Sequence, residues 1–164
     1  MILIGLGSNL ESADGHSTVQ NLENALAALA TCNIQILRSS RFYETAPVPA
    51  NDAPWYVNAV AEVSTELSAR DLLKGLLAIE TQLGRIRGMQ NAARIIDLDL
   101  LDFHGSITTE KNLILPHARM TERAFVLRPL IDVAPAWRHP VSGRTVTSLL
   151  NEIMANQIVR PLTP

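Results

Sequence analysis

Two carboxylates stand two residues apart in an otherwise apolar stretch, RIIDLDLLDF, at residues 94–103. The composition is that of a buried β-strand, and residues i and i+2 of a strand point to the same side. Asp97 and Asp99 should therefore share one face, with their Cα atoms roughly 6.5 Å apart. Burying two unpaired carboxylates would be prohibitively costly. We therefore expect both side chains to meet cations, either arginines or divalent metal ions.

The neighbours of the two aspartates divide between the faces of the expected strand by strict alternation. The face of the aspartates should also carry Ile95, Leu101 and Phe103, and the opposite face Ile96, Leu98, Leu100 and Asp102. This assignment places Asp102 outside the candidate site.

Several arginines lie near this strand in a chain whose net charge is −2. They are Arg85, Arg87, Arg94, Arg119, Arg123 and Arg128. Such a cluster in an acidic protein favours a compact anionic ligand over a polymer, although any one of these arginines is as compatible with a solvated surface.

The D-x-D pattern alone is short and common, and on that pattern a salt-bridged pair is the simpler interpretation. The apolar setting and the arginines favour a metal site. Mg²⁺ is the expected ion, because it is usually held by one or two carboxylates plus substrate phosphates. Two such ions, bridged by Asp97 and Asp99, would serve phosphoryl or nucleotidyl transfer.

Other polar residues could join this site. Glu80 falls at the edge of the apolar stripe of an expected helix, so it is either a pocket carboxylate or an ordinary flanking residue. His117 follows a proline in LPHARMTERAFVLRPL (115–130) and is either a phosphate contact or structural. Asn9 lies in a GSN turn whose backbone amides could face phosphate, although the chain contains no P-loop motif.

A proline-rich loop, TAPVPANDAP (45–54), separates two expected strands. Thr45, Pro47, Tyr56 and Asn58 flank it and offer apolar and hydrogen-bonding groups together. This combination suits a flat heterocycle. The alternative is a surface loop beside a half-buried strand.

The composition excludes several classes of protein. Apolar residues make up 47% and charged residues 18%, which argues against disorder. The net charge and an aromatic content of 4% argue against nucleic-acid binding. A single cysteine excludes an intrachain disulfide and a cysteine-rich zinc site. Neither a membrane span nor a signal peptide is evident, so we expect a soluble cytoplasmic protein forming one domain over residues 1–164.

The elements that must position these residues follow from the apolar periodicity. Strands are expected at residues 1–6, 33–44, 55–67 and 94–103, with helices at 18–30 and 68–83 between them. The order β-α-β-β-α-β predicts an α+β fold with a ferredoxin-like core. C-terminal additions follow: a helix or turn at 125–135, a helix at 145–157, and an irregular tail at 159–164.

Taken together, the motifs resemble one enzyme family, 6-hydroxymethyl-7,8-dihydropterin pyrophosphokinase. The resemblance covers residues 2–135, and the order of the D-L-D strand and the P-H…R-x-F block makes it specific. Its motifs are GLGSNL, FYETAPV followed by YVNAV, IETQLGRIR, ARIIDLDLLDF and LPHARMTERAFVLRPLIDVAP.

This resemblance implies transfer of pyrophosphate from ATP to the hydroxymethyl group of the pterin, giving AMP and the pterin diphosphate for folate biosynthesis. It implies that Asp97 and Asp99 hold two Mg²⁺ ions and act in catalysis with Arg85 and Arg94. ATP would be bound by Asn9, Glu80, Arg85, Arg87, Arg94, His117 and Arg123. The pterin would be bound by Thr45, Pro47, Val48, Tyr56, Asn58 and Phe125. No obligate protein partner is implied.

One segment departs from the family pattern. Many members carry Arg-Trp-Gly-Pro before the arginine that corresponds to Arg94, whereas this chain has MQNAA at residues 89–93. The aromatic residue expected to close over the pterin is therefore missing. Two other interpretations remain open from the residues themselves. One is a different metal-dependent nucleotidyl or phosphoryl transferase, and the other is a small-ligand regulatory module with structural carboxylates.

Overall fold

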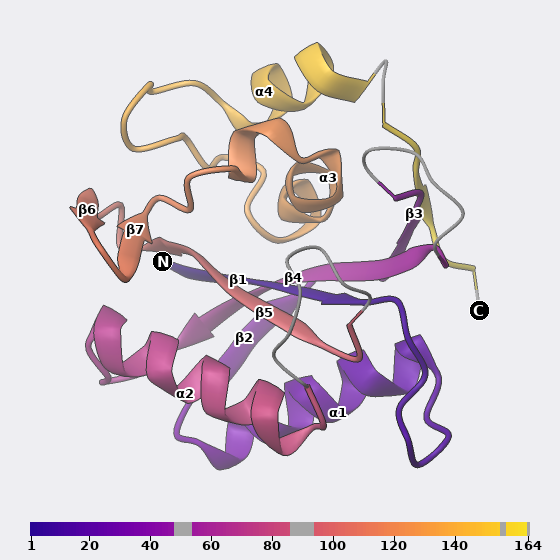
Figure 1. The fold of residues 1–164 in the computed structure, drawn as a ribbon. Coiled ribbons are helices and arrows are strands. Elements are labelled where there is room, and N and C mark those ends of the chain that lie inside the picture. Colours follow the sequence, from indigo (N-terminus) through magenta and orange to yellow (C-terminus); the bar gives the residue numbers. More distant parts are fainter. Residues whose placement is uncertain (48–53, 86–93, 155–156, 164) are drawn as a thin grey trace.

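The computed structural model describes residues 1–47, 54–85, 94–154 and 157–163. An antiparallel sheet forms the middle layer, with helices α1 and α2 on one face and α3 and α4 on the other (Figure 1). The bounds are β1 Ile2–Ser8, α1 Thr18–Thr31, β2 Gln35–Ser39, β3 Tyr43–Thr45, β4 Tyr56–Ser64, α2 Ala69–Gln82, β5 Asp97–Phe103, β6 Thr108–Glu110, β7 Leu113–Leu115, η1 Met120–Glu122, α3 Ala124–Val133, α4 Val146–Ile153 and β8 Val159–Pro161.

The sheet has the order β5-β1-β4-β3-β8, and β2 also pairs with β4. Strands β1 and β4 are central, which agrees with their continuous apolar sequences. A separate hairpin, β6-β7, lies beside the end of β5. The expected mixture of helices and strands is confirmed, and all the strand pairs are antiparallel in the part of the chain that the structure describes.

Helices α1 and α2 begin at serine caps. Gln20 N–H donates to Ser17 Oγ, and the Gln20 side chain accepts from Ser17 N–H, which completes a capping box. Asp71 N–H donates to Ser68 Oγ at 3.2 Å, as the serine in the sequence predicts. The apolar stripes of both helices then pack on the sheet. No helix in the part of the chain described here is long and apolar enough to cross a bilayer.

The sheet separates two apolar cores. The first lies under α1 and α2 and includes Ile4, Leu22, Leu76 and Leu98. The second lies under α3 and α4. It includes Leu3, Val60, Leu101, Leu127, Leu130 and Leu149. Successive residues of each central strand therefore face opposite cores, as the period of two requires.

Two predicted elements differ from the structure. The expected strand at 33–44 is two strands, because Ser40 turns inward between β2 and β3 and its hydroxyl accepts from Val60 N–H at 3.0 Å. The tail expected to be irregular forms β8, which pairs with β3. A three-residue strand gives too short a pattern for periodicity to reveal.

The predicted faces of β5 are correct only for its first half. The pairing register shifts from Ile4↔Leu100 to Leu3↔Asp102, so Leu101 is the extra residue of a β-bulge. Asp102 consequently lies on the same side as Leu101, where its carboxylate accepts from Trp137 Nε1 at 2.6 Å. Phe103 packs against the first core instead of sharing a face with the two upstream aspartates. Strict alternation fails here because a bulge reverses the facing of every later residue.

Candidate active site

Asp97 and Asp99 lie at the start of β5. The alternating residues Leu98 and Leu100 face the first core, so the two aspartates point to the other side of the sheet, which α3 covers. Their side chains are 28% and 36% exposed. The shared face predicted from the i, i+2 spacing is therefore present. The cations that meet these carboxylates come from three separate segments.

Two arginines hold Asp97. Arg85 Nη1 lies 2.7 Å from Asp97 Oδ1, and Arg94 Nη1 lies 2.5 Å from Oδ2. Arg85 follows the C-terminal end of α2, and Arg94 precedes β5. Each oxygen of this carboxylate thus faces its own guanidinium, and both arginine side chains are less than one third exposed.

Asp99 meets a second pair of basic groups, at longer distances. Arg123 Nη1 lies 3.5 Å from Asp99 Oδ2, and His117 Nε2 lies 3.9 Å from the same oxygen. Burial, together with the charge of Asp97, raises the pKa of Asp99 above its usual value. Burial also lowers the pKa of His117, which favours the neutral imidazole. The negative charge on Asp99 is therefore less well compensated than that on Asp97.

Glu80 is a pocket carboxylate and not a flanking surface residue, since only 1% of it is exposed. Its Oε1 accepts from Leu98 N–H at 2.7 Å and pairs with Arg85. Burial raises the pKa of Glu80 to about 7. Glu80 thus connects α2 to β5 through the hydrogen bond from Leu98 and fixes the position of Arg85 through an ion pair.

Asn9 fixes the approach to β5. Its Oδ1 accepts from Arg94 N–H at 2.7 Å, and its own N–H donates to Arg94 O at 3.0 Å. Its Nδ2 donates to Pro54 O at 3.4 Å, at the approach to β4. Asn9 therefore holds the backbone of Arg94 through two hydrogen bonds, and a third bond connects Asn9 to the segment before β4.

The residues beside the proline-rich loop lie on the same sheet face as the aspartates. In the register of the sheet, Asp97 pairs with Gly7, and Gly7 pairs with Asn58. Asn58 is buried and donates from Nδ2 to Thr45 Oγ1 at 2.8 Å. The carboxylates and this polar pair are thus separated by a single glycine of β1.

Pro47 is buried, and Tyr56 and Phe125 are half-buried. The guanidinium of Arg123 lies over the ring of Phe125, 5.4 Å from its centroid. One residue predicted to bind ATP therefore contacts one predicted to bind the pterin. Val48 and Arg87 fall outside the described residues.

Gly7 lies within this group of residues but was not among those predicted from the sequence. A Cβ at this position would lie 2.9 Å from Asn58 Oδ1, closer than ordinary packing permits. The available signal was a glycine inside a continuous apolar strand, which often marks a close approach of another group.

An open pocket of about 550 Å³ lies elsewhere. It is lined by residues at the start of β2 and by Ser64, at the opposite end of β4 from Asn58. It contains none of the residues described above and belongs to a different part of the surface.

Comparison with known proteins gives a consistent result. A sequence model of the 7,8-dihydro-6-hydroxymethylpterin-pyrophosphokinase (HPPK) family matches residues 3–135. A 2-amino-4-hydroxy-6-hydroxymethyldihydropteridine pyrophosphokinase of Methylorubrum extorquens is 36% identical over 157 residues, covering 96% of this chain and 96% of that protein. A protein of the same name from Pseudomonas aeruginosa is 38% identical over 149 residues, covering 91% and 89%.

Larger proteins also contain a similar region. The folic acid synthesis protein fol1 of Pneumocystis carinii is 35% identical over 163 residues, which are 99% of this chain but 21% of that protein. The crystal structure of wild-type Plasmodium falciparum HPPK-DHPS superimposes with a TM-score of 0.72 at 17% identity, covering 94% of this chain and 44% of that one. At that identity the structural likeness concerns the fold alone.

Proposed function

This chain belongs to the 7,8-dihydro-6-hydroxymethylpterin-pyrophosphokinase family, and from that premise we propose that it transfers pyrophosphate from ATP to 6-hydroxymethyl-7,8-dihydropterin. The hydroxymethyl oxygen forms a bond to the β-phosphorus of ATP. The bond from that phosphorus to the α,β-bridging oxygen breaks, and its electron pair leaves with AMP. The hydroxyl proton passes to solvent, and the pterin diphosphate supplies folate biosynthesis.

One observation carries this proposal. The row Asp97–Gly7–Asn58 across three strands sets a cluster of basic groups directly beside a buried hydrogen-bonding pair. A reaction between a polyphosphate and a polar heterocycle needs these two environments side by side, because the attacking oxygen must lie in line with the phosphorus.

The phosphates of ATP would be bound by Arg85, Arg94, Arg123 and His117, with Arg87 included on the family motif. A guanidinium presents five N–H donors in a fixed fork, so the contacts with Asp97 leave donors for phosphate oxygens. Glu80 and Asn9 are buried, and they act by holding Arg85 and Arg94 in place. Phosphoryl transfer requires chiefly such positioning and charge stabilisation.

Asp97 and Asp99 fit the proposed pair of Mg²⁺ ions. No group of three or more acidic, histidine or cysteine ligands occurs among the described residues. Mg²⁺ does not need one, since one or two carboxylates plus substrate phosphates normally suffice. Burial and the neighbouring charge of Asp97 raise the pKa of Asp99, so a cation bound beside Asp99 would stabilise its charged form. Bound there, Mg²⁺ would neutralise part of the charge on the polyphosphate.

The pterin would lie against Thr45, Pro47, Tyr56, Asn58 and Phe125, with Val48 completing the loop side. Thr45 and Asn58 present polar atoms toward one another, and Phe125 provides an apolar ring next to Arg123. We also propose a single ferredoxin-like domain, supported by the β5-β1-β4 order with β2 and β3 outside it. A cytoplasmic enzyme without an obligate protein partner would suit these small substrates.

The proposed reaction is tested by incubating the protein with Mg²⁺, ATP and 6-hydroxymethyl-7,8-dihydropterin and separating the products. AMP and a pterin diphosphate should form in equal amounts, and omission of the pterin should stop AMP formation. ADP as the main nucleotide product would contradict the proposal and favour a different phosphoryl transferase.

A further inference from the structure

The first turn of α3 carries a hydrogen-bonding requirement that its own sequence does not meet. The N-cap residue is Arg123, whose side chain makes no capping hydrogen bond. The first N–H groups of a helix need partners from outside the helix. Ala124 N–H finds one in the side chain of Gln157, whose Oε1 accepts it at 2.9 Å.

The same side chain makes a second bond on the other side of Arg123. Gln157 Nε2 donates to Glu122 O at 2.8 Å. One amide therefore bridges the end of η1 and the start of α3, with Arg123 between its two contacts. Because both flanking peptide groups are held, the direction in which the Arg123 side chain leaves the backbone is held as well.

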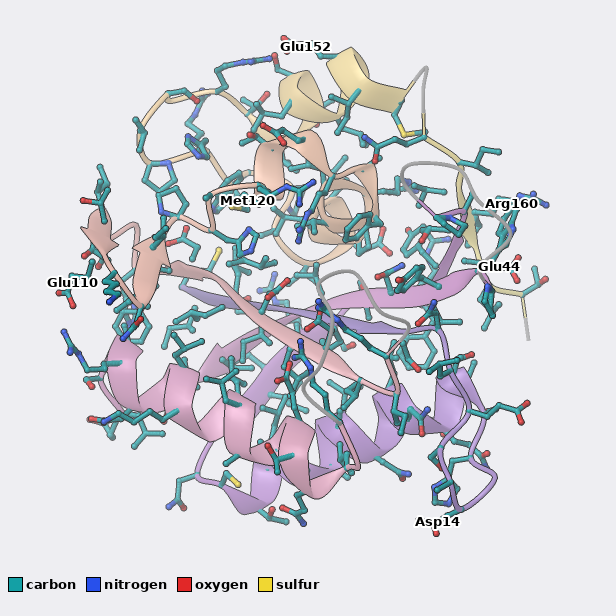
Figure 2. The ribbon with its side chains drawn as sticks, in the orientation of Figure 1. Asp14, Glu44, Glu110, Met120, Glu152 and Arg160 are labelled. Atoms are coloured by element: carbon teal, nitrogen blue, oxygen red, sulfur yellow. The ribbon has the colours of Figure 1, made fainter. Side chains whose placement is uncertain are left out.

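The direction of the Arg123 side chain decides which groups its guanidinium reaches. Arg123 reaches Asp99 with its guanidinium and covers the ring of Phe125. The buried side chain of Met120 anchors η1 in the second core (Figure 2). Gln157 thus adds a side-chain contact that orients the segment between η1 and α3, beside the backbone bonds of Arg123 to Met120 and Val126.

The residues that follow Gln157 reach the other half of the site. Ala46 N–H donates to Ile158 O at 3.4 Å, and Val159 pairs with Thr45 in the register of β3 and β8. Figure 2 shows Arg160 beside Glu44 at this edge of the sheet, as their pairing requires. The short segment 157–161 therefore touches both the phosphate side and the heterocycle side.

We propose that Gln157 is a positioning residue for Arg123 and Phe125, an inference that rests on the proposed function. It lies beyond residues 3–135, the part of the chain that the family model matches. Loss of the bridge should lower ATP affinity and turnover by misdirecting Arg123, without removing any group that touches substrate.

The principal variant is Gln157→Leu, which keeps the approximate shape and removes both hydrogen bonds. A displacement of about 1 Å near the reacting groups can cost up to about a hundredfold in rate, so we expect kcat/KM to fall by roughly tenfold or more. The KM for ATP should rise. The melting temperature should fall by a few degrees as well, because Ala124 N–H loses its partner in a buried setting, so the distinction rests on a double-mutant cycle. The matched control is Ile158→Ala, which trims a side chain that is 52% exposed and leaves the backbone bond to Ala46 intact.

A double-mutant cycle distinguishes positioning from a general structural role. If Gln157 acts through Arg123, adding Gln157→Leu to Arg123→Ala should cause little further loss of activity. Additive losses would overturn the proposal, and so would a Gln157→Leu enzyme with wild-type kinetics. Calorimetric titration of ATP into the wild type and into Gln157→Leu gives an independent readout. If the wild type forms no pterin diphosphate, the proposed function is wrong. Equal ATP affinities of the wild type and Gln157→Leu would instead refute the role of Gln157.

Discussion

Asn58 Oδ1 lies 2.9 Å from the point that a Cβ on Gly7 would occupy. The side chain of Asn58 therefore lies over β1 at a position where the backbone has no Cβ, and Gly7 pairs with Asp97 of β5 on its other side. Because Gly7 has no side chain, the polar pair Asn58–Thr45 can lie next to the strand that carries Asp97.

Substitution of Gly7 by alanine should displace the Asn58 side chain and break its bond to Thr45. We expect the KM for the pterin to rise by about tenfold and the free energy of unfolding to fall by roughly 1–3 kcal/mol. The KM for ATP should change much less. Steady-state kinetics with each substrate varied separately, together with thermal unfolding, check these expectations.

Gly5→Ala is the matched control, because it adds the same methyl group on the same face of β1. Its Cβ would meet the side chain of Leu101 at 3.4 Å, an ordinary contact distance. Similar effects on pterin KM from both substitutions would show that the close approach of Asn58 is unimportant.

The sequence predicted the parts of this site that depend on local patterns. The spacing of Asp97 and Asp99 fixed their common face, and the apolar runs located β1 and β4. The bulge at Leu101, the strand β8 and the bridge by Gln157 depend on partners far away in the chain. No local period encodes a register shift between two strands, so these features required the structure.

The assignment of roles also came from two sources. Arg85, Arg94 and Arg123 were candidates because they are basic and near a carboxylate pair, but many arginines fit that description. The family motifs selected these three together with Arg87, which lies outside the described residues. The structure places Arg85, Arg94 and Arg123 within 3.5 Å of Asp97 or Asp99. The burial of Glu80 could not be predicted from its helical position alone, because a residue at the edge of an apolar stripe can be either buried or exposed.

Replacement of Asp99 by asparagine should separate activity from stability. The raised pKa of Asp99 means that its charged form is disfavoured in the folded protein, so at neutral pH that charge lowers the free energy of unfolding. Asp99→Asn should therefore raise the melting temperature of the metal-free protein while lowering kcat by at least about a hundredfold. Differential scanning calorimetry and product assays measure the two effects.

Asp14→Asn is a suitable control for the loss of one negative charge, since Asp14 is exposed on a loop far from α3 (Figure 2). It should leave both quantities unchanged. A large drop in melting temperature for Asp99→Asn would identify this carboxylate as a structural ion-pair partner instead.

Tyr43→Phe should have the opposite profile, with a loss of stability at unchanged activity. The Tyr43 side chain is fully buried, and its hydroxyl donates to Asp132 Oδ2 at 2.8 Å. Removing a hydrogen bond to a charged group costs roughly 1–3 kcal/mol. The melting temperature should fall by about 2–4 °C for each kcal/mol. A KM change for either substrate would instead place Tyr43 in the binding machinery.

Glu80→Gln tests the buried carboxylate through the pH dependence of stability. The folded-state pKa of Glu80 is about 7, above the usual value of 4.5, so the folded protein binds this proton more tightly than the unfolded chain does. The stabilising contribution of the protonated group is complete below pH 4.5 and is lost as the pH rises through 7. Glutamine does not titrate, so the melting temperature of Glu80→Gln relative to wild type should rise between pH 5 and pH 8.

The same substitution weakens the hydrogen bonding of Glu80 to Arg85, and the KM for ATP should therefore increase. The exposed Glu23→Gln on α1 should show neither effect, and a melting-temperature difference for Glu80→Gln that is independent of pH would show that the buried carboxylate has an ordinary pKa.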